Sequence, residues 1–335
     1  DFAGEIVHPQ KWPEDLDYAG KHVVVIGSGA TAVTLVPALA KTAGHVTMLQ
    51  RSPSYMANLP AIDPIAAQLR KRLPSGVSSE IVRVKNIAYT MFTYWLARSK
   101  PAKMTSLLRT DVEAALPAGY DFDTHFSPHY NPWDQRLCLV PDGDLFAAIS
   151  NGSASMVTDQ IEHFTPDGIA LASGDRLHAD IIITATGLRL QALGGMQLRV
   201  DGELVDIPST VAYKGVMLAG VPNFALTIGY VNASWTLRSD LVARYVCRLL
   251  DFMRQIGAVA CTPAPPTSSV RAPLLDLTSG YVTRGKDLMP KSGDEDPWQL
   301  HHNYLRDLRL LRHAPVADRA LRFTKTSVGA TWAAR

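Results

Sequence analysis

The sequence has few cysteines, little excess charge and no long apolar run. A formal net charge of +2 over 335 residues lacks the strong basic excess of a nucleic-acid-binding protein. No stretch reaches the ~18 uninterrupted apolar residues of a membrane span. Hydrophobic residues make up 47% of the chain, as is typical of a globular protein, and the length allows two or three compact units. We therefore expect a soluble, cytoplasmic protein that binds no nucleic acid.

The cysteines and histidines show no metal-binding pattern. The cysteines are Cys138, Cys247 and Cys261. They include no CxxC pair and are odd in number, which favours reduced thiols over a disulfide framework. His125 and His129 are four residues apart, but Pro128 between them argues against a shared helical face. We therefore predict no metal site.

The clearest motif is a glycine-rich turn between an apolar strand and a helix, KHVVVIGSGATA at residues 21–32. Gly27 permits a tight turn, Gly29 lets the backbone approach a pyrophosphate, and the small Ala32 lets the helix pack on the strand. The phosphates would lie at the helix N-terminus, where free N–H groups favour an anion. The pattern predicts dinucleotide binding rather than an ordinary strand-to-helix turn. The expected cofactor-binding residues here are Gly27, Ser28, Gly29, Ala30, Thr31 and Ala32.

The end of the next predicted strand indicates which dinucleotide binds. Residues 45–50, HVTMLQ, form this strand, and Arg51 and Ser52 follow it directly. Arg51 stands 24 positions after Gly27, where an NAD-binding protein would carry an acidic residue for the ribose 2′-hydroxyl. An arginine suits the 2′-phosphate of NADPH instead. We therefore predict that Arg51 and Ser52 bind NADPH; the alternative is a solvated arginine at a strand end.

A second motif, FxGxxxHxxxWP, lies at the start of the sequence. Its residues are Phe2, Gly4, His8, Trp12 and Pro13. From the residues alone, this segment is a loop with aromatic anchors. Its spacing, however, resembles the fingerprint of the Baeyer–Villiger branch of the flavin-containing monooxygenases. With DLDYAGKHVVVIGSGATAV at 15–33 and VTMLQRSPSYM at 46–56, the chain resembles the ethionamide-activating type of this family, in patches as far as about Arg312.

The resemblance implies an enzyme that binds FAD and NADPH. NADPH would reduce the flavin, and O₂ would then supply an oxygen atom to a small ketone or to a sulfur or nitrogen centre. Such enzymes have two dinucleotide turns, and only one is found in this sequence, so we expect that about the first third of the enzyme is missing. Two alternatives are an NADPH-binding fragment or pseudo-enzyme without turnover, and an NADPH-linked reductase without oxygen chemistry.

The resemblance also implies roles for residues outside the turn. Arg136 matches an arginine that reaches over the flavin, where its charge would stabilise an anion during catalysis. The alternative is a structural arginine paired with Asp134 or Asp144. The family commonly has lysine before this arginine; Gln135 stands there, which weakens the case for a second phosphate contact.

Two further cofactor contacts are expected near the flavin. Thr186 and Gly187 end the segment DIIITATG, which resembles the crossover by which these enzymes leave the NADPH domain. Asn232 lies in a polar turn that, in the family, faces the flavin ring.

The fold expected is α/β: a Rossmann-like NADPH-binding domain with a helical insertion, followed by the C-terminal return segment of an FAD-binding domain. The expected parts are an interdomain linker at 1–20, the NADPH domain at 21–56 and 126–190, the insertion at 57–125, and the FAD-domain segment and tail at 191–335.

Periodicity adds four local expectations. Residues 155–187 read as a short meander leading to a strand buried on both faces. Residues 224–230 are predicted to form a strand, and the chain after His313 a loose tail. The apolar run at 87–96 is predicted to lie in the core or in a pocket wall; a face that contacts a membrane surface is the alternative.

Overall fold

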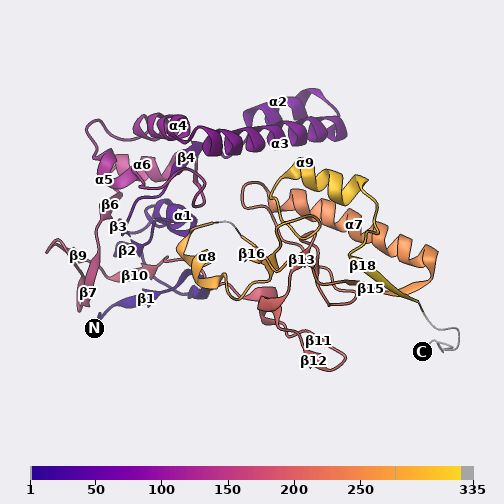
Figure 1. Ribbon diagram of the computed structural model, residues 1–335. Helices are drawn as coiled ribbons and strands as arrows, with labels where there is room; N and C mark the ends of the chain where they lie inside the picture. The colour runs from indigo at the N-terminus through magenta and orange to yellow at the C-terminus, as the bar shows by residue number, and fades with distance from the viewer. Residues whose placement is uncertain (1, 276, 326–335) are drawn as a thin grey trace. The chain divides into compact units, whose positions relative to one another are not determined.

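The computed structural model describes residues 2–275 and 277–325, so residues 326–335 of the expected tail lie outside the described part (Figure 1). The chain forms two compact units, Asp1–Leu188 and Arg189–Arg335. Unit 1 contains a five-stranded parallel sheet with the order β1-β10-β2-β3-β6, which confirms the α/β class. Its strands are β1 (Glu5–Val7), β2 (His22–Ile26), β3 (His45–Gln50), β6 (Ala154–Thr158) and β10 (Ile181–Thr184).

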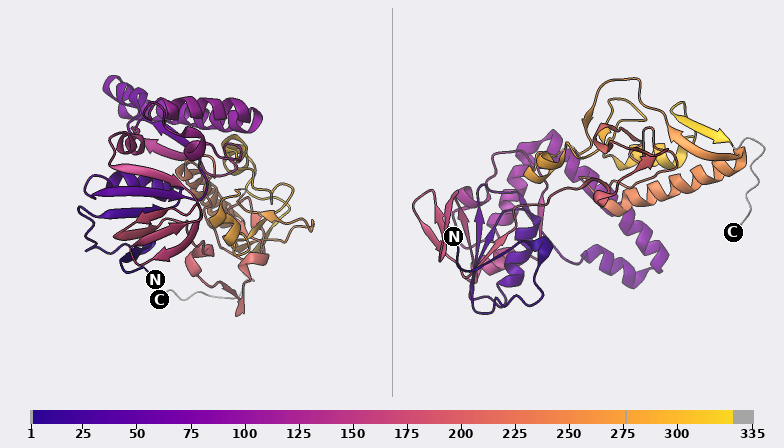
Figure 2. Two further views of the ribbon diagram at one scale, coloured as in Figure 1. Left: turned by 90° about the vertical axis from the view of Figure 1, so that its left-hand side faces the viewer. Right: turned by 90° about the horizontal axis from the view of Figure 1, so that it is seen from below.

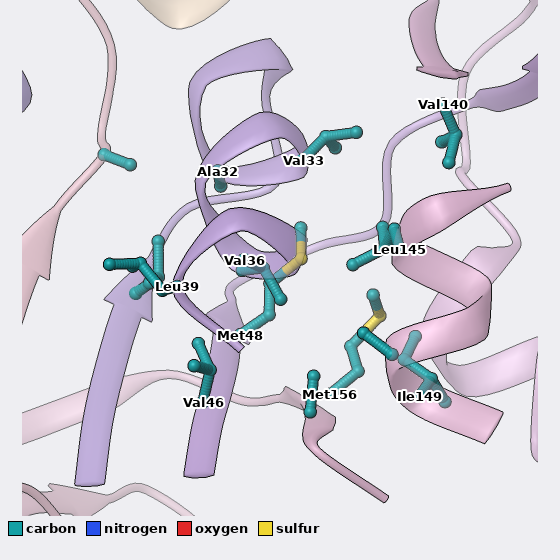
Figure 3. Packing of buried hydrophobic residues seen from close by; sticks show 14 of the residues in the cluster. Ala32, Val33, Val36, Leu39, Val46, Met48, Val140, Leu145, Ile149 and Met156 are labelled. Carbon is teal, nitrogen blue, oxygen red and sulfur yellow. The ribbon is translucent and has the colours of Figure 1, made fainter. Parts of the chain in front are cut away.

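Alternating side chains of β2 pack on opposite faces of this sheet. Val23 and Val25 lie in a cluster with helices α1 (Ala30–Leu39) and α6 (Asp144–Ser150), whose packing Figure 3 shows. Val24 and Ile26 pack on the other face. That face is covered by an antiparallel meander of β7 (Ile161–Thr165), β8 (Gly168–Leu171) and β9 (Arg176–His178). The meander is shorter than expected, because residues 155–158 belong to β6, which pairs with β3 in the parallel sheet. The β10 strand is buried on both faces, as predicted.

The first strand corrects the expectation that residues 1–20 form only a loop. Residues 5–7 pair in parallel with β10, from Glu5 opposite Ile181 to Val7 opposite Ile183. Val7 is only 3% exposed, and the β-branched Ile6 and Val7 suit an edge strand. Three residues are too few for the sequence pattern to distinguish an edge strand from a loop, and the pairing with β10, far along the chain, makes this segment a strand.

The region from the end of β3 to Pro141, which includes the expected helical insertion at 57–125, contains three longer helices and a short one, together with two strands. The helices and strands are β4 (Met56–Leu59), α2 (Pro64–Arg72), α3 (Ser75–Ser99), α4 (Pro101–Glu113), α5 (Phe122–Phe126) and β5 (Cys138–Pro141). Strands β4 and β5 pair in parallel. Helices α2 and α3 form a hairpin that extends away from the sheet of their own unit (Figure 2).

The apolar run at 87–96 is not simply core. Ile87 and Leu96 are buried, but Tyr89, Phe92 and Trp95 are each more than half exposed. The prediction of a core or pocket-wall segment is therefore wrong for four of these ten residues, because apolar residues surround α3 but its packing partners cover only part of its surface. Within the described residues, no helix is both long enough and apolar enough to cross a bilayer.

Unit 2 is built around helix α7 (Trp235–Ile256), which ends at Gly257 in the left-handed conformation (φ 66°). Two short helices, α8 (Gly280–Gly285) and α9 (Tyr304–Asp307), follow, and α9 continues into a π-helical segment at Leu308–His313. The strands pair two by two and antiparallel: β11 (Arg199–Val200) with β12 (Glu203–Leu204), β13 (Ala212–Tyr213) with β14 (Met217–Leu218), β15 (Ala258–Pro263) with β18 (Leu321–Lys325), and β16 (Ala272–Pro273) with β17 (Lys291–Ser292).

Two expectations for unit 2 are corrected. Residues 224–230 are extended but form no strand: the Leu226 N–H donates to the Val216 carbonyl at 2.7 Å, and no ladder follows among the described residues. A β-prone segment becomes a strand only when a neighbouring strand pairs its backbone groups. Conversely, part of the expected tail is ordered, because β18 pairs with β15 and Leu321 is buried.

Candidate cofactor-binding site

The glycine-rich turn has the geometry that its sequence predicts. Gly27 has φ +133°, and a Cβ there would collide with the carbonyl oxygen of Ala185, so only glycine fits. Gly29 is the N-cap of α1, and a Cβ on it would meet no atom within 4 Å. Ala32 is fully buried against the sheet. The backbone at Gly29 therefore has open space above it, while Gly27 and Ala32 fix the turn and the helix in place.

The N-terminus of α1 is free to bind an anion. Gly29 has no side chain to cap the helix. In the part of the chain that the structure describes, the N–H groups of Ala30, Thr31 and Ala32 have no protein acceptor. Unsatisfied N–H groups and the helix dipole favour negative charge at this point. A pyrophosphate group fits these donors.

The turn lies where ligands bind in open α/β sheets. In the strand order, β2 lies between β3, which follows it in the chain, and β10, which comes much later. Ligands of open α/β sheets bind outside the carboxyl ends of such parallel strands. Gly27 follows β2, and Thr186 and Gly187 (φ +100°) follow β10. The structure thus brings these predicted residues to one edge of the sheet.

Ser28 connects the turn to the end of β3. Its hydroxyl donates to the carbonyl of Ser52 at 3.1 Å and lies 2.8 Å from the hydroxyl of Ser54. Two predicted residues, Ser28 and Ser52, are therefore in contact, and the side chain of Ser28 positions the Arg51 segment. Gln50, which is buried, also holds this segment through a 2.8 Å bond to the hydroxyl of Thr158.

Arg51 is exposed at the carboxyl end of β3. Among the described residues its guanidinium has no hydrogen-bond or ion-pair partner. A cation beside the turn with no internal partner is available for an anionic ligand group.

Arg136 lies on an exposed loop that is anchored on both sides. Two residues later, Cys138 enters β5, and its thiol contacts the Ser28 carbonyl at 3.7 Å. Burial raises the pKa of Cys138 to about 11, and the nearby charge of Arg136 opposes this shift. Asp134, a proposed structural partner of Arg136, instead binds Arg98 at 2.6 Å.

The other proposed partner, Asp144, uses a carboxylate oxygen to accept from the Leu145 N–H at 2.8 Å. Within the described residues Arg136 forms no ion pair. The structural alternative for Arg136 is thus not observed. Gln135 is half-buried, and its backbone forms a bridge with Pro132. This bridge helps to fix the conformation of the loop.

Asn232 belongs to unit 2. Its amide donates to the His302 carbonyl at 3.0 Å, and its Oδ1 is buried with no partner among the described residues. A buried acceptor without a donor is costly, so a donor from a bound group would stabilise it. This orphaned atom is compatible with the cofactor contact expected at Asn232.

Unit 2 contains two buried charge clusters that are not among the residues expected from the sequence. Arg238 is fully buried and pairs with Asp307, which also accepts from the Tyr230 hydroxyl at 2.7 Å. Burial and then the charge of Asp307 raise the pKa of Tyr230. The available signal was Arg238 itself, which shares a helical face with Leu241 and the other buried residues of α7.

In the second cluster, buried Lys214 pairs with Asp318 at 3.0 Å. Its ammonium lies over the rings of Tyr213 and Tyr245, 5.0 Å from each centroid. Burial lowers the pKa of Lys214, and the hydrogen bond to Asp318 opposes that shift. These groups hold β13, α7 and the segment before β18 together, and we assign them a structural role.

Two glycine substitutions should separate folding from binding. We expect Gly27→Ala to lower the free energy of unfolding by about 2–4 kcal/mol, because alanine is strained at this φ and collides with Ala185. Gly29→Ala should change stability by less than about 1 kcal/mol, since its φ of −83° suits any residue. It should nevertheless weaken NADPH binding about tenfold or more by filling the space a pyrophosphate needs. Denaturant unfolding and calorimetric titration measure the two effects; unchanged NADPH affinity in Gly29→Ala would contradict this site.

No protein-family model matches the chain. Among curated proteins, it is 54% identical over 327 residues to the FAD-containing monooxygenase EthA of Mycobacterium tuberculosis, covering 97% of this chain and 67% of that protein. It is 47% identical to the probable FAD-binding monooxygenase AlmA of Acinetobacter baylyi, with 97% and 66% coverage. The chain thus spans about two thirds of the length of these relatives.

Solved structures show the same fold at low identity. An oxidized steroid monooxygenase bound to NADP matches with a TM-score of 0.67 at 16% identity, over 97% of this chain and 71% of that one. The monooxygenase OTEMO in complex with FAD and NADP matches with a TM-score of 0.59 at 20% identity, over 78% and 58%. The resemblance identified from the motifs is confirmed by the curated relatives: the chain belongs to the FAD-containing monooxygenases and, within them, to the EthA-like enzymes.

Proposed function

We propose that this chain is part of an NADPH- and FAD-dependent monooxygenase that oxidises a small ketone or a sulfur or nitrogen centre with O₂. The observation that carries the proposal is the open, uncapped N-terminus of α1 near Arg51, which has no partner among the described residues, in a member of the FAD-containing monooxygenases. The relatives support the enzyme class, and the turn supports the cofactor.

In this proposal unit 1 is the NADPH domain. The N–H groups of Ala30, Thr31 and Ala32 bind the pyrophosphate, and Gly29 leaves room for it. Arg51 and Ser52 bind the 2′-phosphate, with the Ser28 hydroxyl holding their loop. Thr186 and Gly187 follow β10, at the edge of the sheet where ligands bind in such folds.

Unit 2 is proposed to contribute to FAD binding, with the buried Oδ1 of Asn232 as the acceptor for a group of the cofactor. FAD, when bound, supplies electron transfer from NADPH and the activation of O₂. The chain's own contribution to chemistry is the Arg136 guanidinium, which stays charged at any relevant pH and stabilises developing negative charge.

Arg51 gives the direct test of the cofactor assignment. We expect Arg51→Ala to weaken NADPH binding by about 1.5–3 kcal/mol, the range for a lost charge-assisted hydrogen bond, and to leave NADH binding almost unchanged. Calorimetric titration of both nucleotides into the chain measures the difference. Arg176→Ala, which removes an exposed arginine from β9, is the matched control and should affect neither. An equal loss for NADPH and NADH in Arg51→Ala would refute the assignment.

A further inference from the structure

One side of α3 carries a continuous exposed apolar stripe. Its residues follow each other at spacings of four and three, which places them on one helical face. They are Val77, Ile81, Val84, Ala88, Phe92 and Trp95. Five of the six residues have between 43% and 64% of their surface exposed, and Ala88 is exposed as well. At 1.5 Å per residue the stripe is about 27 Å long. Patches of this extent on soluble proteins mark interaction sites.

The packing of α3 explains why this stripe has no partner in unit 1. The helix packs against α2 and α4, and its buried residues, Ser78, Ile87, Leu96 and Ala97, lie on other sides. The hairpin extends away from the sheet (Figure 2), so within unit 1 the stripe is open along its length. Something outside unit 1 is needed to cover it.

The hairpin, together with the few residues on either side of it, is also the most basic part of the chain. Residues 61–105 contain eight Lys or Arg and two Asp or Glu, a net charge of +6, whereas the whole chain has +2. The basic groups flank the stripe at both ends: exposed Arg70, Lys71 and Arg72 precede it, and exposed Lys100 and Lys103 follow it. One of the two acids, Asp63, is already paired with Lys85. The excess positive charge is therefore not compensated inside the hairpin.

We propose that the α2–α3 hairpin docks on the surface of an anionic phospholipid bilayer. The combination of an apolar face with aromatic residues and flanking cations is that of a helix lying in the lipid interface. The stripe inserts Phe92 and Trp95 among the acyl chains near the headgroups, and the basic residues contact lipid phosphates. The contact is peripheral, since no described helix could span the bilayer.

The charge argues against a second copy of the chain as the occupant. A symmetric dimer through this face would bring two copies of residues 61–105, each of net charge +6, together, and like charges repel across such an interface. An anionic surface removes that repulsion and attracts each basic residue. Because this attraction is electrostatic, binding should depend strongly on the salt concentration and on the fraction of anionic lipid.

Vesicle binding tests the proposal. The 335-residue chain is sedimented with vesicles of equal parts phosphatidylglycerol and phosphatidylcholine, and with phosphatidylcholine alone. We expect binding to the anionic vesicles to exceed binding to the neutral ones at least tenfold and to fall as salt rises. Phe92→Ser with Trp95→Ser should lower the partition coefficient about 100-fold, since each exposed aromatic then loses its burial in lipid. Replacing Arg70, Lys71 and Arg72 with glutamine should also lower it about 100-fold.

The matched control is Leu204→Ser with Leu250→Ser, which removes two leucines of unit 2 that are each 54% exposed. It should bind as the parent does. Brominated lipids should quench the Trp95 fluorescence of the parent, and this quenching should be absent in Trp95→Phe. All variants alter exposed residues, so thermal unfolding should match the parent and exclude misfolding as a cause.

Three results would overturn the proposal. The first is equal binding of the parent to the anionic and the neutral vesicles, or binding to the anionic vesicles that Phe92→Ser with Trp95→Ser leaves unchanged. The second is a dimer in sedimentation equilibrium that dissociates in Trp95→Ser while lipid binding is absent, which would make a second copy the occupant. The third is loss of vesicle binding when the chain is extended to the full length of its relatives, because the added part would then cover the stripe.

Discussion

Arg136→Ala should still bind NADPH and accept electrons from it, yet lose oxygenation about 100- to 1000-fold and release hydrogen peroxide instead. This is the usual cost of removing a preorganised electrostatic contact to charge that develops during a reaction. The guanidinium is exposed and has no ion-pair partner among the described residues, so its loss should leave the fold intact. The measurement compares NADPH consumption, product and peroxide in the enzyme extended to the length of its relatives, with FAD bound.

Two controls separate chemistry from structure in this experiment. Arg136→Lys keeps the charge without the planar guanidinium, and we expect it to recover part of the oxygenation. Thermal unfolding of Arg136→Ala should match the parent. Oxygenation at the parent rate, or a large loss of stability, would mean that Arg136 does not serve the chemistry.

Asp307→Asn should lower the free energy of unfolding of unit 2 by about 3–5 kcal/mol. The substitution leaves the fully buried Arg238 guanidinium without its counter-charge, and an uncompensated buried charge is far more costly than a lost surface pair. Arg238 also donates to the Lys214 carbonyl at 2.8 Å and lies 5.6 Å from the centroid of the Tyr230 ring, but neither contact can replace a carboxylate. Denaturant unfolding measures the change.

A surface pair on the same helix is the control. Asp251 pairs with Arg254 at 3.2 Å, but both side chains are largely exposed, so Asp251→Asn should leave stability almost unchanged. Removing both charges of the buried pair, as in Arg238→Met with Asp307→Leu, should recover much of the loss. If Asp307→Asn were as stable as Asp251→Asn, the cluster around Arg238 would not hold unit 2 together.

The dinucleotide turn could be predicted because its determinants are local. Gly27, Gly29 and Ala32 act within one strand, one turn and one helix, and each position has a steric reason that the sequence pattern already contains. The same holds for the meander at 161–178, whose turns are set by Gly168 and Gly174, both with positive φ. Such features need no knowledge of distant partners.

The features that escaped prediction depend on distant partners. The edge strand at residues 5–7 is a strand because β10 lies beside it, and residues 224–230 are not one because no described strand does. Helix α3 is apolar on several sides, so periodicity predicted the helix but could not say which side is buried. The role of Arg136 comes from resemblance alone, since its exposed loop carries no local signature.

The most direct test of the central claim follows electrons and oxygen separately. In the FAD-bound enzyme at the length of its relatives, NADPH is mixed without O₂ and the flavin absorbance is followed; isotopically labelled dioxygen and a ketone or sulfide substrate are then added. We predict that NADPH bleaches the flavin far faster than NADH does, and that one labelled oxygen atom appears in the product. Bleaching without label in the product would identify an NADPH-linked reductase, and no bleaching would identify a nucleotide-binding protein without turnover; either result would contradict the proposed monooxygenase.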